Sequence, residues 1–254
     1  MLIYSNGFTE TDLALSRENG FGIEVLEYTN PASLDDFENS HPKVARLLHG
    51  IKCASMHGAY RDLFSASTDP LIREVTKQRF VQSIQAARFH KIGRVVFHSP
   101  YKRAFDGYSK AATQDFLKRT VDFWLQFEEN IPNGITVYVE NVEDDKPEVF
   151  ARIFEETGSG KIRCCFDIGH AHCNSAAPVG EWLDVLGDFV QHVHLHDNDG
   201  KSDQHLPLGK GNAPLFNAII KVLGRSGTRV PFVLECDVFE SAKWLDRHGF
   251  DIFD

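Results

Sequence analysis

The chain has 254 residues, with 36 acidic against 27 basic side chains and a formal net charge of −9. A hydrophobic fraction of 42% and a charged fraction of 25% are ordinary for a soluble globular protein, and they exclude a disordered, collagen-like or coiled-coil chain. The acidic balance gives no non-specific attraction to phosphate backbones, which disfavours a nucleic-acid partner. At this length we expect one large domain or two small ones.

The chain carries no recognisable targeting segment. Its first residues, MLIYSNGF, enter an apolar run without a basic leader, and no segment reaches the ~18 apolar residues of a membrane span. We therefore expect a soluble, cytoplasmic protein without a membrane partner. The five cysteines form no C-x-x-C pair, which indicates reduced structural thiols. The twelve histidines are the unusual part of the composition.

Short β-branched or apolar runs alternate with longer amphipathic segments along the chain. Two of the amphipathic segments, Asp69–His90 and Thr113–Asn130, have the length and apolar spacing of helices. Eight strands, each followed by a crossover long enough for a helix, predict a single (β/α)8 TIM barrel domain over residues 1–254. A doubly wound open sheet is the alternative, but no G-x-G-x-x-G motif follows the first strand. The expected strands are Leu2–Ser5, Ile23–Glu27, Ile51–Met56, Arg94–His98, Ile135–Glu140, Ile162–Asp167, Val190–His194 and Val230–Glu235.

The alternation of side chains predicts which of them face the barrel interior, because successive residues of a barrel strand face the interior and the helices in turn. In the seventh strand Val193 meets the helices, so His192 and His194 point inward. The same alternation points Glu140 and Asp167, at the ends of the fifth and sixth strands, into the barrel. In each strand the last inward residue is a potential metal ligand.

Six potential ligands stand at the C-terminal ends of consecutive expected strands, the face where barrel active sites lie. They are His57, His98, Glu140, Asp167, His194 and Glu235. Taken singly, a histidine here is most often a hydrogen-bonded rim residue, and each glutamate has an ion pair with Arg94 or Arg163 as a plainer explanation. Converging together, carboxylates and imidazoles need a cation, and mixed nitrogen and oxygen ligation suits Zn²⁺, Mn²⁺, Co²⁺ or Fe²⁺.

Two local motifs add further candidates. Asp167-Ile-Gly-His170 places a histidine one turn after a strand end, and Asp203-Gln-His205 lies in a loop after the seventh strand, before Leu-Pro-Leu-Gly-Lys-Gly. The second motif alone is more often a solvated loop. Structural or surface roles are expected for the other histidines, which are His41, His49, His90, His172, His192, His196 and His248.

From about Ser55 to Glu235 the chain resembles the xylose isomerase-like TIM-barrel superfamily, which contains sugar (phosphate) isomerases and epimerases and the endonuclease IV DNA-repair enzymes. The resemblance implies a metal set of Glu140, Asp167, His194 and Glu235. The endonuclease IV branch implies a trinuclear zinc cluster with five further ligands and a tyrosine near the first of them. These residues are His57 and Tyr60 in HGAY, His98 in FHSP, His170 in DIGH, and Asp203 and His205 in DQH.

The chain also departs from the endonuclease IV pattern. ENVEDDK stands where that branch has a glycine-rich, ENTAG-like segment, and HDNDG replaces its HLND-S run. The segment Thr29–Ser40 is acidic where a DNA-intercalating loop needs arginine, and the rim segments Glu143–Asp145 and Asp197–Asp203 are also net acidic. These differences favour the sugar isomerase and epimerase members, with a small sugar as partner.

The first hypothesis is therefore a divalent-metal-dependent isomerase or epimerase of a small sugar or sugar phosphate, acting through an enediolate. Glu140 and Glu235 serve as general base and acid on the two sides of the substrate. In this interpretation one Zn²⁺ or Mn²⁺ ion is bound. Substrate contacts are assigned to His57, His98, His170, Tyr60 and, for a phosphate, Lys210.

The alternative hypothesis is a phosphoesterase of the endonuclease IV type, with up to three zinc ions and Glu140 bridging two of them. A catalytically inactive barrel that binds partners is a third interpretation, and it predicts ligand losses that this chain does not have. The superfamily's frequent dimers and tetramers leave a homo-oligomer open.

Overall fold

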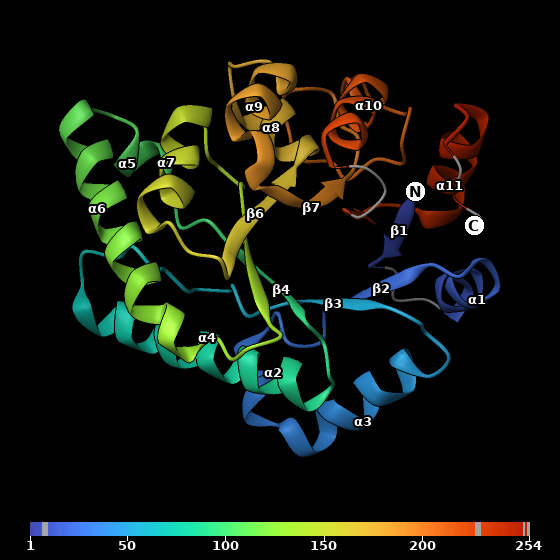
Figure 1. The fold of residues 1–254 in the computed structure, drawn as a ribbon, viewed down its shortest axis with the longest axis horizontal. Coiled ribbons are helices and arrows are strands. Elements are labelled where there is room, and N and C mark those ends of the chain that lie inside the picture. Colours follow the sequence, from blue (N-terminus) through green and yellow to red (C-terminus); the bar gives the residue numbers. More distant parts are fainter. Residues whose placement is uncertain (7–9, 227–229, 251, 253–254) are drawn as a thin grey trace.

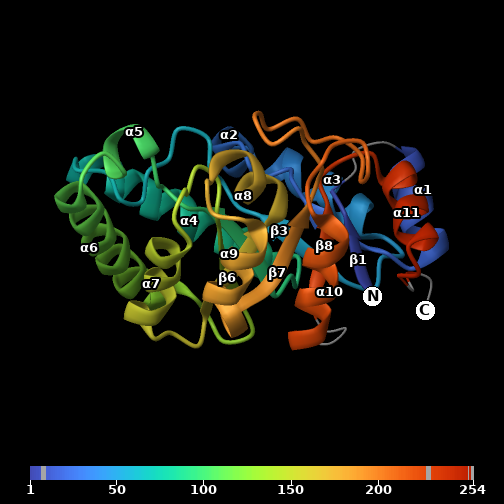
Figure 2. The same ribbon diagram turned by 90° about the horizontal axis from the view of Figure 1, so that it is seen from above.

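The computed structural model describes residues 1–6, 10–226, 230–250 and 252, and in it eight parallel strands close into a barrel in chain order. The strands surround the centre of the molecule (Figure 1), and β8 pairs with β1 to complete the ring (both labelled in Figure 2). This arrangement confirms the predicted (β/α)8 TIM barrel. The strands are β1 (Leu2–Ser5), β2 (Gly22–Val25), β3 (Ala54–His57), β4 (Arg94–His98), β5 (Thr136–Glu140), β6 (Ile162–Asp167), β7 (Val190–Leu195) and β8 (Pro231–Leu234).

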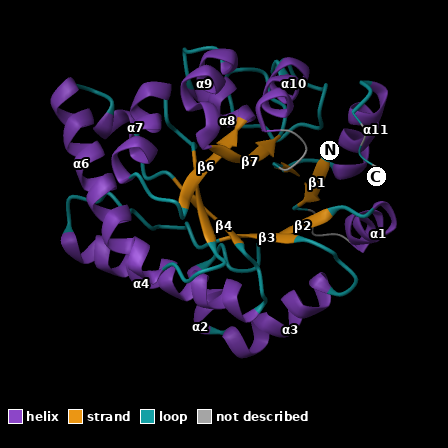
Figure 3. Cartoon of the chain, in the orientation of Figure 1, coloured by secondary structure: helices purple, strands orange, loops and turns teal. Residues whose placement is uncertain are grey.

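At least one helix follows every strand, so that helices surround the barrel (Figures 2 and 3). The α-helices are α1 (Glu10–Asn19), α2 (Pro31–Asp35), α3 (Phe37–Leu48), α4 (Pro70–Phe89), α5 (Arg103–Asp106), α6 (Lys110–Phe127), α7 (Pro147–Thr157), α8 (Ile168–Asn174), α9 (Val179–Leu186), α10 (Leu215–Ser226) and α11 (Val238–Arg247). Two 3₁₀ turns are η1 (Glu128–Asn130) and η2 (Gly187–Phe189). Within the described ranges, no helix is long and apolar enough to cross a membrane.

Several element ends differ from the predicted ones because local hydrogen bonds decide them. Strand β3 begins three residues after the predicted start, since the amide of Ile51 bonds to the carbonyl of Leu48 and keeps that residue in a turn. Helix α6 begins three residues before the predicted start because the Ser109 side chain accepts a hydrogen bond from the amide of Ala112 and caps the helix.

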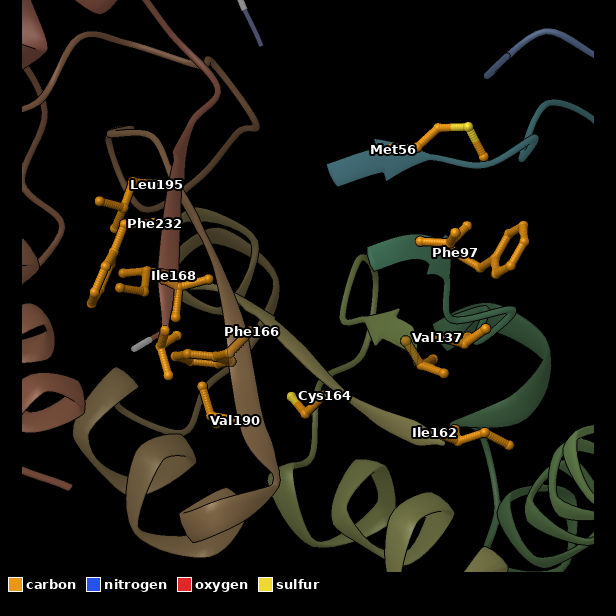
Figure 4. Close-up of a cluster of buried hydrophobic side chains, with 14 of the residues drawn as sticks. Met56, Phe97, Val137, Ile162, Cys164, Phe166, Ile168, Val190, Leu195 and Phe232 are labelled. Atoms are coloured by element: carbon orange, nitrogen blue, oxygen red, sulfur yellow. The ribbon is translucent and has the colours of Figure 1, made fainter. Parts of the chain in front are cut away.

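The predicted alternation of side chains is confirmed. Outward-facing residues of the strands, such as Val137, Phe166 and Leu195, pack in the apolar layer between strands and helices (Figure 4). Inside the barrel, Tyr138 and Cys165 belong to a separate small apolar cluster. Because the outward-facing residues supply most of the apolar core, polar side chains can occupy the barrel interior at the C-terminal ends of the strands.

The two barrel arginines do not neutralise the candidate glutamates, so the ion-pair explanation is wrong. Arg94 donates to the hydroxyl of Tyr138 at 2.6 Å and to the carbonyl of Gln191 at 3.2 Å. Arg163 donates to the carbonyl of Ser159 at 2.6 Å. The arginines are held among neutral acceptors, and the carboxylates at the strand ends meet histidines instead.

Candidate metal centre

Glu140, the last residue of β5, lies at the centre of the site and is 1% exposed. Nε2 of His57 lies 3.2 Å and Nε2 of His98 3.5 Å from one carboxylate oxygen, Oε2. Nδ1 of His194 lies 3.1 Å and Nδ1 of His170 3.3 Å from the other oxygen, Oε1. Each oxygen of this carboxylate therefore faces a different pair of imidazoles.

Four strand-end residues form the central group. Ligand atoms of Glu140, Asp167, His194 and Glu235 all lie within 4.8 Å of one another. Nδ1 of His194 is 3.2 Å from Glu235 Oε1 and 4.0 Å from Asp167 Oδ2. Asp167 Oδ2 is buried without a hydrogen-bond partner, an arrangement that is costly for a carboxylate. This orphaned oxygen among three other donors fits a divalent cation.

A second group, on the β3–β4 side, consists of His57, His98 and Glu140. Nδ1 of His57 donates to the carbonyl of Gly58 at 3.0 Å, which leaves Nε2 facing Glu140. The Tyr60 ring stacks on His98 with centroids 4.1 Å apart, so the predicted tyrosine lies beside this group. Gly58 permits the close turn after β3, because a Cβ there would overlap the ring of Phe97.

A third group lies over β6 and β7 and contains the predicted His170, Asp203 and His205. Nε2 of His170 is 3.4 Å from Asp203 Oδ2, and Nε2 of His205 is 3.3 Å from Asp203 Oδ1. The N-terminal cap of α8 explains the position of His170, since its amide bonds to Asp167 Oδ1 at 2.7 Å. The structure thus brings together all nine predicted ligands in three adjoining groups.

His196 also belongs to the third group, and sequence reasoning assigned it a structural or surface role. Its Nε2 lies 3.2 Å from Asp167 Oδ1 and 3.5 Å from Asp203 Oδ1, and its ring stacks on His205 at 4.1 Å. Gly169 makes room for this ring, because a Cβ there would overlap it. The alternation that points His192 and His194 inward also applies to His196, two residues further on, and it could have identified this residue.

The loop between β7 and α10 carries Asp203 and His205, and Asp197 organises it. The Asp197 carboxylate accepts hydrogen bonds from the amides of Asn198, Gly209, Gly211 and Ala213, all at 2.9 to 3.0 Å. Sequence reasoning counted Asp197 as part of an acidic rim, but it is 1% exposed and serves the loop. The glycine-rich LGKG run therefore folds around the Asp197 carboxylate and donates backbone hydrogen bonds to it.

Lys210 lies in the same loop. Its side chain is exposed, and its amide donates to the carbonyl of Pro207 at 3.0 Å.

The two central glutamates differ in their electrostatic environments. Burial alone raises the pKa of Glu140, but the surrounding histidines, His194 foremost, hold that pKa well below its usual range. Burial, opposed by His194 and reinforced by neighbouring carboxylates, raises the pKa of Glu235. Burial also lowers the pKa of His98 to about 3, which keeps this imidazole neutral and able to bind a metal.

The fold and the converging side chains define a TIM barrel with its candidate site at the C-terminal ends of the strands. The chain belongs to the family of xylose isomerase-like TIM barrels, whose model matches residues 14–248. The resemblance noted from the motifs is therefore confirmed.

Curated relatives are distant. The uncharacterized protein MJ1311 of Methanocaldococcus jannaschii is 28% identical over 181 residues, which cover 68% of this chain and 61% of the relative. The match thus spans about three fifths of that relative's length. The fructoselysine 3-epimerase of Escherichia coli O157:H7 is 40% identical over 50 residues, covering 20% of this chain and 18% of the enzyme.

Solved structures resemble the chain over nearly its whole length. The TTHB071 protein from Thermus thermophilus, soaked with ZnCl₂, has a TM-score of 0.72 at 24% identity and covers 98% of this chain and 96% of its own. A D-tagatose 3-epimerase-like protein has a TM-score of 0.75 at 22% identity, with coverage of 98% and 97%. At these identities the similarity establishes the shared fold.

Proposed function

We propose that the protein is a divalent-metal-dependent isomerase or epimerase of a small sugar or sugar phosphate, acting through an enediolate. The observation that carries the proposal is the convergence of Glu140 and Glu235 on Nδ1 of His194, beside the orphaned oxygen of Asp167. The names of similar proteins, a D-tagatose 3-epimerase-like protein and a fructoselysine 3-epimerase, support the substrate class.

The central group would hold the metal through Glu140, Asp167, His194 and Glu235. A bound Zn²⁺ or Mn²⁺ ion supplies Lewis acidity toward neighbouring sugar oxygens and so acidifies the carbon beside a carbonyl. The chain supplies the proton transfers. Glu140 and Glu235, whose oxygens lie 3.1 and 3.2 Å from Nδ1 of His194, would remove a proton and return one as general base and acid.

The substrate would lie in a cavity of about 470 Å³ next to the second donor group. Tyr60 and His98 line this cavity together with Phe64 and Lys102. Its size and mixture of aromatic and polar walls are typical of small-molecule sites. His57 and His170 would reach substrate hydroxyls from the metal side. Lys210 does not line the cavity. Its contact with a phosphate stays a prediction that applies only if the substrate is a sugar phosphate.

The test is solvent proton exchange. The metal-loaded protein is incubated with a panel of ketoses and sugar phosphates in D₂O, and deuterium at carbon is followed by NMR. We expect deuterium incorporation beside the carbonyl of at least one substrate, lost on chelation of the metal. Absence of exchange across the panel by a metal-loaded, folded protein would contradict the proposal.

A second candidate is a multinuclear zinc phosphoesterase of the endonuclease IV type. It is favoured by one observation, namely that the donors form three adjoining groups and that Glu140 belongs to two of them. The discriminating measurement is the metal content per chain together with nicking of an abasic-site duplex. Three zinc ions with chelator-sensitive nicking would favour the phosphoesterase, whereas one ion with sugar exchange and no nicking would favour the isomerase.

A further inference from the structure

Glu24 is a carboxylate inside the barrel that the site described so far does not use. It lies on β2, the strand beside β3, and is 2% exposed. Its Oε2 accepts hydrogen bonds from Ser55 Oγ at 2.7 Å and from His192 Nε2 at 2.9 Å. Its Oε1 lies 3.0 Å from Nε2 of His194, within ion-pair distance. Both atoms are buried, and neither forms a hydrogen bond of regular geometry among the described residues.

Three other ligand histidines show what a partner at the second ring nitrogen does. His57, His170 and His205 each donate through Nδ1 to a backbone carbonyl, those of Gly58, Asn141 and Glu235, at 2.8 to 3.0 Å. In each ring Nε2 then faces the carboxylates of its donor group. A backbone carbonyl therefore fixes which nitrogen of these rings carries the proton.

His194 is turned the other way round. Its Nδ1 faces Glu140 and Glu235 at 3.1 and 3.2 Å, so Nε2 must carry the proton when Nδ1 binds a metal. The partner at Nε2 is the carboxylate of Glu24 rather than a carbonyl. A carboxylate in this place holds the ring and also makes its metal-binding nitrogen more basic.

We propose that Glu24 is a positioning residue of the metal centre: it holds His194 with its proton on Nε2 and its Nδ1 directed at the ion. This inference rests on the proposed metal-dependent function and adds a residue to its machinery. Glu24 acts through His194, since its own oxygens contact Ser55, His192 and His194.

Ligand atoms of Cys165, His192 and His194 also lie within 4.8 Å of one another. Nε2 of His192 donates to Glu24 Oε2 at 2.9 Å, so His192 holds the carboxylate that faces His194.

The test compares metal binding by the full-length wild-type protein and the variants Glu24→Gln, Ser55→Ala and His194→Gln. Each is stripped of metal and titrated with Co²⁺, followed by visible absorption, and with Zn²⁺ against a chromophoric chelator. The ion lost in His194→Gln identifies the site concerned. Glu24→Gln should raise the dissociation constant of that ion about 10- to 100-fold and alter its Co²⁺ spectrum.

Ser55→Ala is the matched control, because Ser55 bonds to the other oxygen of the same buried carboxylate. It should bind the ion as the wild type does. The proposal is overturned if Glu24→Gln keeps the wild-type affinity and spectrum, or if Ser55→Ala weakens binding as much as Glu24→Gln. If the wild type itself binds neither Co²⁺ nor Zn²⁺, the proposed function fails as well.

A measurement on the wild type covers the case in which Glu24→Gln does not fold. In the zinc-loaded protein labelled with ¹⁵N-histidine, NMR should show His194 protonated at Nε2 and metal-bound at Nδ1. A His194 ring protonated at Nδ1 would overturn the proposal.

Discussion

Glu140 concentrates the chemistry of the site in one side chain. Its two oxygens face two different donor groups, and four histidines surround it at 3.1 to 3.5 Å. Among the described residues its ion-pair neighbours are imidazoles, since Arg94 and Arg163 bond elsewhere. Substitutions here should therefore separate metal binding from proton transfer.

Glu140→Gln and Glu235→Gln should each lower the rate of carbon-bound proton exchange by about 10²- to 10⁴-fold. Glu140→Gln should also lose metal, because Glu140 belongs to two donor groups. The measurements are deuterium exchange and metal content. Glu156→Gln is the control, since Glu156 pairs with Arg152 on the exposed side of α7 and should leave both unchanged. Near-full activity in either of the first two variants would remove the acid and base assignment.

Asp144 predicts a pH dependence of stability. It is 3% exposed, accepts hydrogen bonds from Ser99 and Val142, and burial raises its pKa from 3.8 to about 7. The native state thus favours the protonated acid, so this stabilisation is complete below pH 3.8 and is lost as the pH rises to about 7. Between pH 5 and 8 the free energy of unfolding should fall by about 3 kcal/mol through this group.

In Asp144→Asn this part of the pH dependence should vanish, because the amide mimics the neutral acid. Urea unfolding at pH 5 and pH 8 measures the difference from the wild type. The exposed Asp188→Asn variant should keep the wild-type dependence. An Asp144→Asn protein that loses as much stability as the wild type over this range would show that Asp144 is ionised throughout.

At the scale of elements, the loop after β7 depends on close backbone packing around Asp197. A Cβ at Gly211 would overlap the carbonyl oxygen of Asn198, whereas a Cβ at Gly224, in helix α10, meets nothing within 4 Å. The same substitution at these two glycines should therefore have opposite effects.

Gly211→Ala should lower the free energy of unfolding by about 1–3 kcal/mol and displace Asp203 and His205. Gly224→Ala should raise it by up to about 1 kcal/mol, since alanine favours a helix. Urea unfolding gives both changes, and metal content reports on the loop. Equal stability of the two variants would mean that the loop does not depend on the close approach of Gly211 to the Asn198 carbonyl.

The alternation rule explains how much of the site was predictable. It placed Glu140, Asp167 and His194 because each is the last inward residue of its expected strand. Applied to β2, it would also have pointed Glu24 inward, but its partner His194 lies 170 positions along the chain and meets it only after the barrel closes. The turn at Ile51 was not predictable, because an apolar run does not show where strand pairing begins.

For the whole molecule, the net charge of −9 overstates the negative charge that reaches the surface. Asp144 and Asp197 are buried in hydrogen bonds, and bound metal would neutralise the carboxylates of the centre. The composition argument against a nucleic-acid substrate is correspondingly weaker than the count of charges implies.

Metal should stabilise the whole fold, because the ligands come from strands far apart in sequence. At a free Zn²⁺ or Mn²⁺ concentration 100 times the dissociation constant, stabilisation of about 2.7 kcal/mol should raise the unfolding temperature by about 5–10 °C. Thermal unfolding with and without chelator measures the shift, and Glu140→Gln should show less of it. An unfolding temperature indifferent to metal and chelator would contradict a native-state metal site.

The predicted metal ligands are distributed unevenly around the barrel. The predicted ligands at the strand ends belong to β3 to β8 or directly follow them, whereas β1 and β2 carry none. Bound metal would therefore connect the ends of six neighbouring strands and leave β1 and β2 unconnected by its ligands. The contact of Glu24 with His194 links β2 to those six strands. A local separation of β2 from the barrel would therefore also disturb the metal centre.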